Sequence, residues 1–486
     1  MAKQQSGNDD DKGITVKKED DMAEWYGQVV TKSEIADYSP VRGCMIIRPL
    51  GYAVWEKIQQ EFNKVLKNKG VKNAYFPLFI PESFFRKEAE HAEGFAPEVA
   101  WIENKDEGGE RLAVRPTSET IMYDSYSRWI RSWRDLPVLI NQWANVCRWE
   151  TSDCKIFLRS REFLWQEGHN VFETEDECEK DVWNWINEYK KLAESLLAVP
   201  MIVGKKTEKE KFAGAVYTTT IEGFMPDGKS LQCGTSHHLG QGFAKSFSIS
   251  FLGKDEKMHT PWQDSWGFST RLIGAMIMMH GDNKGLVLPP KVAQNRIVIV
   301  PILFKDTKKK VLDACHSLLK ELKEHDPVLD DREEYSAGWK FSEWELKGVP
   351  LRIELGPKDL EKKQAVLVRR DTGDKIVIKL PDVRKRAKEV LDSIQEDLLH
   401  KAKRFMDESI VRVTDWDAFM SATGLSAKKL VLAPFCGEEE CEDWIKDKTK
   451  GVTARAIKDD EKMDKGARCI HCGKDARFWV YFARAY

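Results

Sequence analysis

The first third of the chain alternates between helical and extended hydrophobic patterns. Over residues 51–69 the large apolar residues recur every three or four positions, which is typical of an amphipathic helix. The segment 71–81 reads as a strand closed by prolines, and 115–134 reads as a second helix. Strands are predicted over 138–150 and 162–172, with a polar turn between them.

The pattern changes in the second half of the chain. Two more strands are predicted over 231–243 and 246–254, before the pair Pro289-Pro290 marks a linker. A compact α/β unit follows, predicted as a strand at 296–302, a helix at 308–325, a strand at 351–354, a helix at 357–363 and the hairpin "AVLVRRDTGDKIVIKL". A long amphipathic helix over 383–406 then leads to a third unit. The expected parts are a disordered tail (1–13) and three domains, 14–290, 291–395 and 396–486.

Composition and charge exclude some classes of protein. Of the 486 residues 42% are hydrophobic and 32% charged, with a net charge of −2, which argues against a general nucleic-acid coating protein but allows local basic patches. No apolar run approaches the roughly 20 residues needed to span a bilayer. The polar, acidic N-terminus lacks the apolar segment of a secretory signal. We therefore expect a cytoplasmic protein.

Ten cysteines are present, and six of them are scattered singly, as expected of reduced thiols. The other four, Cys436, Cys441, Cys469 and Cys472, form the pattern C-x4-C, 27 residues, C-x2-C. Two close pairs can supply four thiolates to one tetrahedral ion, usually a structural Zn²⁺. Two alternatives stay open: four reduced buried cysteines, or a site in which His471 replaces one thiolate.

The segment "RWETSDCKIFLRSREFLWQEGH" crowds cations, carboxylates and aromatic residues together. Arg148 and Glu150 lie two apart on a predicted strand and so share one face. Arg159 and Arg161 bring further guanidinium groups to the same hairpin, and such groups suit phosphate. The alternative is a surface hairpin held by salt bridges.

Other segments add candidate ligands for the same site. "RPTSET" offers Thr117 and Glu119, suited to a cationic amine, and "LQCGTSHHLGQ" offers Gln232, Thr235 and His237 beside glycines that let a ligand approach. Arg271 begins an apolar helix, whose N-terminus adds attraction for phosphate.

These motifs resemble those of a known family. Arg148-x-Glu150 with Phe163 resembles motif 2 of the class II aminoacyl-tRNA synthetases, the stretch 267–271 resembles motif 3, and the helix and strand over 51–81 resemble motif 1. Together with "RPTSET", "FLWQEGH", "GTSHHLGQ", "GWKFSEWELKGVPLRIELGPKDL" and the terminal cysteines, the chain from about residue 14 to 486 resembles prolyl-tRNA synthetases of the archaeal and eukaryotic type. The resemblance implies an α/β (α+β) protein: an antiparallel-sheet catalytic domain, an α/β anticodon-binding domain and a small zinc-binding domain.

The resemblance also implies ATP-dependent ligation of L-proline to tRNA(Pro) through prolyl-adenylate, with Mg²⁺. Arg148 would bind the α-phosphate and the proline carboxylate, Arg271 the γ-phosphate, and Glu150 would face adenine. Residues implied to line the nucleotide are Arg159, Ser160, Gln232, Thr235 and Ser269. Those implied to hold proline are Thr117, Glu119 and His237 at its polar groups, and Trp165, Glu167, His169 and Phe212 around its ring. The alternative for these aromatic and histidine residues is plain core packing.

Further expectations concern partners and rivals. Motif 1 implies a homodimer, and in relatives the C-terminus ends near the active site, where Tyr486 lies in this chain. A basic set in the second unit either meets tRNA phosphates or is a solvated face: Arg369, Arg370, Arg384, Lys385 and Arg386. About 100 residues separate motifs 2 and 3, too few for a large inserted editing domain. The rival functions are threonyl or glycyl specificity, a non-catalytic binding module, and a ligase acting on another amine or acid.

Overall fold

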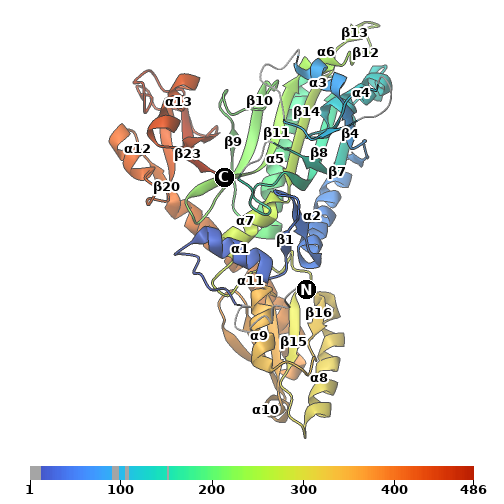
Figure 1. Ribbon diagram of the computed structural model, residues 1–486, viewed down its shortest axis with the longest axis vertical. Helices are drawn as coiled ribbons and strands as arrows, with labels where there is room; N and C mark the ends of the chain where they lie inside the picture. Colours follow the sequence, from blue (N-terminus) through green and yellow to red (C-terminus); the bar gives the residue numbers. More distant parts are fainter. Residues whose placement is uncertain (1–12, 90–97, 104–108, 150–152) are drawn as a thin grey trace, which may run out of the picture.

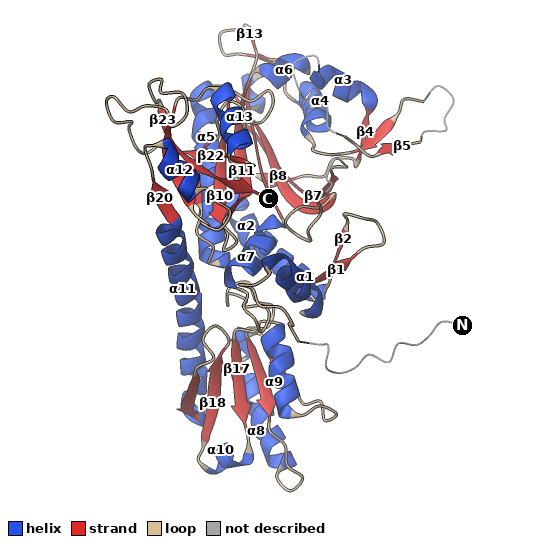
Figure 2. Ribbon diagram, turned by 60° about the vertical axis from the view of Figure 1, so that its left-hand side comes forward, coloured by secondary structure: helices blue, strands red, loops and turns tan. Residues whose placement is uncertain are grey.

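The computed structural model describes residues 13–89, 98–103, 109–149 and 153–486. The molecule is elongated, with the second predicted unit at one end of the long axis (Figure 1). Helix α11 (Val383–Ser409) runs from that unit along one side of the molecule to the terminal strands (Figure 2).

A long, mostly antiparallel sheet organises the rest of the chain. Within the described residues it has eleven strands, in the order β20-β21-β23-β22-β9-β10-β11-β14-β8-β7-β3. Their bounds are β3 Lys72–Asn73, β7 Val138–Cys147, β8 Glu162–Phe172, β9 Ile202–Lys205, β10 Tyr217–Phe224, β11 Lys229–Gly240, β14 Trp262–Ser269, β20 Ile410–Arg412, β21 Leu430–Phe435, β22 Val452–Ile457 and β23 Phe478–Ala485. The strands of the third predicted unit therefore continue the sheet of the first, through the pairing of β22 with β9.

Helices α2 (Pro49–Asn68), α5 (Glu175–Leu197) and α7 (Arg271–His280) bury their apolar faces with this sheet in one large core. In it Trp266 of β14 stacks on Trp185 of α5, with ring centroids 3.9 Å apart. Gly168 on the neighbouring strand makes room for this indole, because a Cβ at that position would lie 2.1 Å from the Trp266 ring. The core thus fixes β8 and β14 side by side.

Smaller elements complete the first and third units. They are α1 Met22–Lys32, β1 Ala36–Tyr38, β2 Met45–Ile47, β4 Phe79–Pro81, α3 Glu82–Ala89, β5 Trp101–Ile102, β6 Leu112–Val114, α4 Glu119–Trp129, a 3-10 turn Trp133–Asp135, α6 Gly242–Ser246, β12 Phe251–Leu252, β13 Met258–His259, α12 Trp416–Ala422 and α13 Glu439–Lys448. Strands β4, β6 and β5 form a separate three-stranded sheet. Among the described residues, no helix combines the length and the apolar character needed to cross a membrane.

The second unit has its own core and a mixed sheet in the order β16-β15-β17-β18-β19. Its elements are β15 Ile297–Pro301, α8 Lys308–Glu321, a 3-10 turn Lys323–His325, β16 Pro327–Leu329, α9 Ala337–Leu346, β17 Leu351–Leu355, α10 Pro357–Glu361, β18 Gln364–Arg369, β19 Lys375–Lys379 and a 3-10 turn Leu380–Asp382. The predicted hairpin is confirmed. Arg370 ties this unit to the first through two hydrogen bonds of 2.6 and 2.7 Å to Asp282.

Three predicted elements were wrong in part. The segment 71–81 is split between two sheets, because Phe76 turns into the core, where its N–H binds Gln142, and Pro77 has no N–H to donate. The helix predicted from residue 115 begins only at Glu119, since Arg115 is buried and binds the Phe76 and Asn145 carbonyls. The run 246–254 is not one strand, because Ser248 adopts a left-handed φ of 54°.

A buried ionic cluster holds the first and third units together. Glu222 on β10 accepts hydrogen bonds from Lys206 (2.7 Å), from Ser230 (2.7 Å) and from Arg455 on β22 (3.1 Å). Burial alone would raise the pKa of Glu222, but the charges of Arg455 and Lys206 outweigh it and lower the pKa to about 2. The two cations therefore depend on this one carboxylate.

Candidate active site

Two adjoining cavities lie over β8, β11 and β14. The first, of about 270 Å³, is lined by Pro116, Thr117, Glu119, Arg148, Trp165, Glu167, His169, Phe212, Gln232, Thr235, His237, Ser265, Trp266 and Gly267. The second, of about 350 Å³, is lined by Arg148, Phe157, Leu158, Arg159, Ser160, Phe163, Trp165, Gln232, Cys233, Gly234, Thr235, Gly267, Phe268, Ser269, Arg271 and Tyr486. The first is small even for a ligand pocket, for which roughly 300–1,000 Å³ is usual, and so suits a small substrate.

The first cavity holds a buried acidic group formed by Glu119, Glu167 and His169. Ligand atoms of the three lie within 4.8 Å of one another. Glu119 accepts a hydrogen bond from Thr117, and Glu167 accepts bonds from Ser118 and from Gln142 (2.9 Å). Two buried carboxylates next to a single imidazole favour the binding of a cationic group in this cavity. The hydrogen bonds hold both carboxylates in fixed positions.

His169 belongs to this acidic group. Its Nε2 lies 3.1 Å from Glu167 Oε2, and its Nδ1 lies 3.2 Å from the Tyr123 hydroxyl. Burial would lower the pKa of His169, but the hydrogen bond to Glu167 and the charges of Glu119 and Glu167 raise it above its ordinary value. His169 is thus buried and hydrogen-bonded within the protein while it also lines the first cavity.

The lining of the first cavity also contains aromatic rings, those of His237, Phe212 and Trp165. His237 is held by Thr218 (2.9 Å) and Thr235 (3.0 Å), and its ring lies 4.7 Å from that of Phe212. Burial, with the charges of His169 and Arg148, lowers the pKa of His237 to about 3, so this imidazole is neutral at physiological pH. Trp165 continues the wall toward the second cavity.

Arg148 stands where the two cavities meet. It lies just beyond the end of β7, and its guanidinium carbon is 5.6 Å from the Phe163 ring centroid and 5.8 Å from that of Trp165. Stacking on aromatic faces orients this cation between the cavities. One guanidinium can therefore contact anionic groups on either side.

The second cavity is cationic. Arg271, the first residue of α7, donates to the carbonyls of Leu158 and Gln232, each at 2.9 Å. Burial lowers the pKa of Arg271, and the nearby charges of Arg148 and Arg159 lower it further. An anion between these three arginines would relieve their mutual repulsion, as polyphosphate does.

Tyr486, the last residue of the chain, is one of the residues that line the second cavity. Its hydroxyl donates to Asp227 Oδ2 at 2.6 Å. The expectation that the last residue of the chain ends near the site therefore agrees with this geometry.

The residues implied for proline all line the first cavity, and those implied for the nucleotide that the structure describes line the second. Glu150 lies outside the described residues. The sequence reasoning missed Ser118 and Gln142, which hold Glu167, and Ser265 and Trp266, which line the first cavity. A signal for Gln142 was available, since a polar residue in the middle of a buried strand needs a partner.

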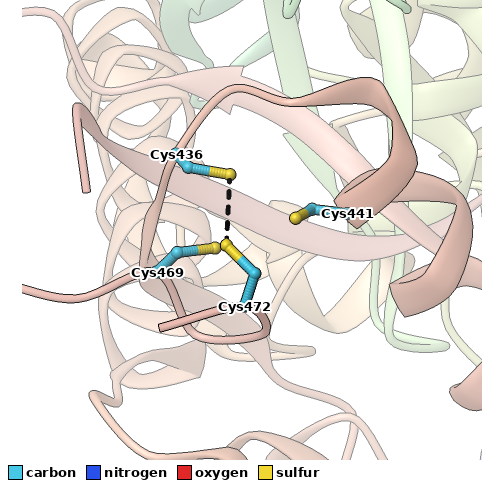
Figure 3. Close-up of side chains that lie close together, drawn as sticks. All are labelled: Cys436, Cys441, Cys469 and Cys472. Atoms are coloured by element: carbon cyan, nitrogen blue, oxygen red, sulfur yellow. Dashed lines mark hydrogen bonds between the residues drawn. The ribbon is translucent and has the colours of Figure 1, made fainter. Parts of the chain in front are cut away.

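The four C-terminal cysteines converge in the third unit (Figure 3). Their sulfur atoms all lie within 4.8 Å of one another, with Cys436 and Cys472 3.9 Å apart. Zinc–sulfur bonds of about 2.3 Å in a tetrahedron place sulfurs about 3.8 Å apart, so the set fits one zinc ion. His471 instead stacks on Trp444, with centroids 3.8 Å apart. Gly437, with φ of 89°, makes the turn after Cys436.

The basic residues of the second unit are mostly committed to partners within the protein. Arg369 pairs with Asp371 and Asp397, each at 2.7 Å, and Arg384 pairs with Glu324 at 2.7 Å. Arg370 is buried against Asp282. Lys385 pairs only at 4.0 Å, with Glu389, and 82% of its side chain is exposed, so it is better placed to meet a phosphate.

Three family models match the chain. "tRNA synthetase class II core domain (G, H, P, S and T)" matches residues 101–280, "Anticodon binding domain" matches 296–390, and "Prolyl-tRNA synthetase, C-terminal" matches 416–486. A proline–tRNA ligase of Natranaerobius thermophilus is 51% identical over 481 residues, covering 98% of each chain. A proline–tRNA ligase of Alkaliphilus oremlandii is 50% identical over 96% of each chain. A cytoplasmic proline–tRNA ligase of Arabidopsis thaliana is 46% identical over 98% of this chain and 91% of its own.

Proposed function

The chain belongs to the class II aminoacyl-tRNA synthetases and, within that class, to the prolyl-tRNA synthetases, and on this premise we propose that it joins L-proline to tRNA(Pro) through prolyl-adenylate. The observation that carries the proposal is the position of Arg148 between an acidic cavity and a cationic one. The relatives are proline–tRNA ligases, which speaks against threonyl or glycyl specificity and against a non-catalytic module.

In this proposal proline occupies the first cavity. Its secondary ammonium faces Glu119, with Glu167 and His169 behind, and Thr117 and His237 complete the polar contacts. Its ring packs against Trp165 and Phe212. The reason is charge and size: a small apolar ring with one cationic nitrogen needs an aromatic wall and a buried carboxylate.

ATP then occupies the second cavity, with its phosphates against Arg148, Arg159 and Arg271 and its remaining contacts at Ser160, Gln232, Thr235 and Ser269. A proline carboxylate oxygen attacks the α-phosphorus in line, forming the mixed anhydride and releasing pyrophosphate. Arg148 stabilises the charge that develops on the α-phosphate. Mg²⁺, when bound with ATP, neutralises further phosphate charge.

The tRNA 3′-terminal hydroxyl next takes the prolyl group and releases AMP. Glu150 is proposed to face adenine.

Glu119→Gln tests the assignment of the ammonium site. Losing a charge-assisted hydrogen bond costs about 1.5–3 kcal/mol, so KM for proline should rise roughly 10- to 150-fold while KM for ATP changes little. Both constants come from ATP–pyrophosphate exchange. The matched control is Asp124→Asn on the same helix, whose carboxylate pairs with Arg128 instead of facing the cavity. An unchanged KM for proline in Glu119→Gln would exclude Glu119 as the ammonium ligand.

We also propose that the four cysteines bind a structural zinc ion. The support is the donor set, four thiols gathered within 4.8 Å with no position left for water. Cys441→Ser should abolish the retained zinc, about one ion per chain in the parent protein, and lower the denaturation midpoint of the third unit, because metal binding contributes to folding. Metal analysis with circular dichroism checks both, with the half-exposed Cys154→Ser as control. Full zinc content in Cys441→Ser would contradict the assignment.

Four further proposals rest on membership of the same family. They are the domain boundaries at 290 and 395, the binding of tRNA(Pro) by the second unit, a homodimer formed through motif 1, and a cytoplasmic location. The boundary at 395 lies inside α11, which continues to Ser409.

Finally, we propose that the protein lacks editing in cis. Residues 173–261, between β8 and β14, form α5, β9–β13 and α6, which belong to the central sheet and the elements around it. A pocket discriminates against a smaller substrate by only about 1–3 kcal/mol per missing methylene, so alanine should be activated weakly. Alanyl-tRNA(Pro) incubated with the protein should deacylate no faster than in buffer. Rapid hydrolysis would contradict the proposal.

A further inference from the structure

A third cavity, of about 360 Å³, lies outside the active site and shares no lining residue with either of its cavities. Five parts of the chain meet there: the segment that leads into α1, the turn between β10 and β11, the end of α7, α11, and the loop before β21. In Figure 1 α1 crosses in front of α7, with α11 beside them. Helix α7 begins at Arg271 in the active site and ends at this cavity with His280.

Three lysines line the third cavity: Lys18, Lys401 and Lys428. Within the part of the chain that the structure describes, none of the three forms an ion pair with a carboxylate. Lys18 Nζ donates to the carbonyls of Gly281 (2.8 Å) and Met279 (3.5 Å). Burial, with the charge of Lys401, lowers the pKa of Lys18 to about 8. The ammonium groups of Lys18 and Lys401 are therefore close enough to repel each other.

The other polar groups of the cavity offset only part of this charge. Asp282 already binds the Arg370 guanidinium through both oxygens. Glu19, which accepts a hydrogen bond from Asn283, keeps its negative charge and offsets one of the three lysines. His280 binds the Leu197 carbonyl at 2.9 Å, and burial, with Lys18 and Lys401, lowers its pKa to about 4. The imidazole is therefore neutral at physiological pH, and the cavity has an excess of positive charge.

The remaining lining is apolar and includes Met22, Met279, Leu398 and Phe405. A bare inorganic anion would gain nothing from such walls, whereas an apolar body removes them from water. We propose that the third cavity binds a small amphipathic organic anion, with its acidic head at Lys18, Lys401 and Lys428 and its apolar body against these side chains. Binding would tie the N-terminal segment to α11 and stabilise the folded protein.

The test uses the full-length protein with proline and ATP present, so that the active-site cavities are filled. The probe is 1-anilinonaphthalene-8-sulfonate, followed by its fluorescence. We expect one site, whose Kd rises at least about tenfold in Lys18→Ala and in Lys401→Ala. Lys403→Ala, on the same helix but paired with Glu194 at 3.4 Å, is the matched control. Octanoate should displace the probe, and millimolar inorganic phosphate should not.

A second measurement does not depend on any variant. Acetylation of Lys18, read by peptide mass spectrometry, should slow when the probe is bound, because the acidic head of the probe covers the Lys18 amine, while acetylation of Lys403 is unaffected. The proposal would be overturned by a probe affinity in Lys18→Ala and Lys401→Ala equal to that of the parent protein, by displacement of the probe with inorganic phosphate, or by acetylation of Lys18 that does not change when the probe is bound.

Discussion

Replacing Arg148 with alanine is expected to lower kcat/KM for proline-dependent ATP–pyrophosphate exchange by about 10³- to 10⁵-fold. The guanidinium lies between the two cavities, where the proline carboxylate and the α-phosphate must meet. The shortened side chain removes both the ground-state contact and the stabilisation of the developing phosphate charge, so kcat should fall as well as the affinity for proline.

The matched control for Arg148→Ala is Arg161→Ala. Arg161 belongs to the same hairpin and lies 4.5 Å from the Trp149 ring centroid, but it lines neither cavity. It should retain exchange within about tenfold of the parent protein, and circular dichroism should show both variants folded. A folded Arg148→Ala variant with near-normal exchange would exclude Arg148 from the chemistry.

The second large effect concerns stability. Glu222→Ala leaves Lys206 and Arg455 buried without their carboxylate, which should cost about 3–5 kcal/mol in the free energy of unfolding. Denaturant unfolding followed by circular dichroism measures it. Glu208→Ala, at an exposed carboxylate paired with Lys211, should cost at most about 1 kcal/mol. Replacing the three charged residues, Glu222, Lys206 and Arg455, together with apolar residues should restore most of the lost stability. Equal midpoints for Glu222→Ala and Glu208→Ala would contradict this account.

The cluster also predicts a dependence on pH. The folded-state pKa of Glu222, about 2, lies below its ordinary value of 4.5. Its contribution to stability is therefore complete above pH 4.5 and is lost as the pH falls toward 2. The difference in stability between the parent protein and Glu222→Gln should shrink over this window, as measured by unfolding at a series of pH values.

Local pattern was enough to predict much of the fold. The apolar spacing of α2, the extended run of β8 and the "DTGD" turn depend on neighbours in sequence, and the structure has all three. The pairing of β22 with β9 joins Ile457 to Lys205 and could not be predicted from periodicity, which carries no information about distant partners.

The same limit applies to the site. The residues that line the two cavities could be predicted from the resemblance of short motifs, because these motifs place charged and aromatic side chains on adjacent strands. The hydrogen-bond partners that hold these side chains in place could not be predicted in this way. Glu167 is fixed by Ser118 and Gln142, and Glu222 by Arg455 more than 200 residues away. Such partners become neighbours only when the sheet assembles.

Amino-acid-dependent ATP–pyrophosphate exchange, with each of the twenty amino acids in turn, tests the central claim most directly. Proline should support strong exchange and alanine a trace, with the remaining amino acids near background. If folded, zinc-replete protein supported exchange with none of the twenty amino acids, the account would be contradicted.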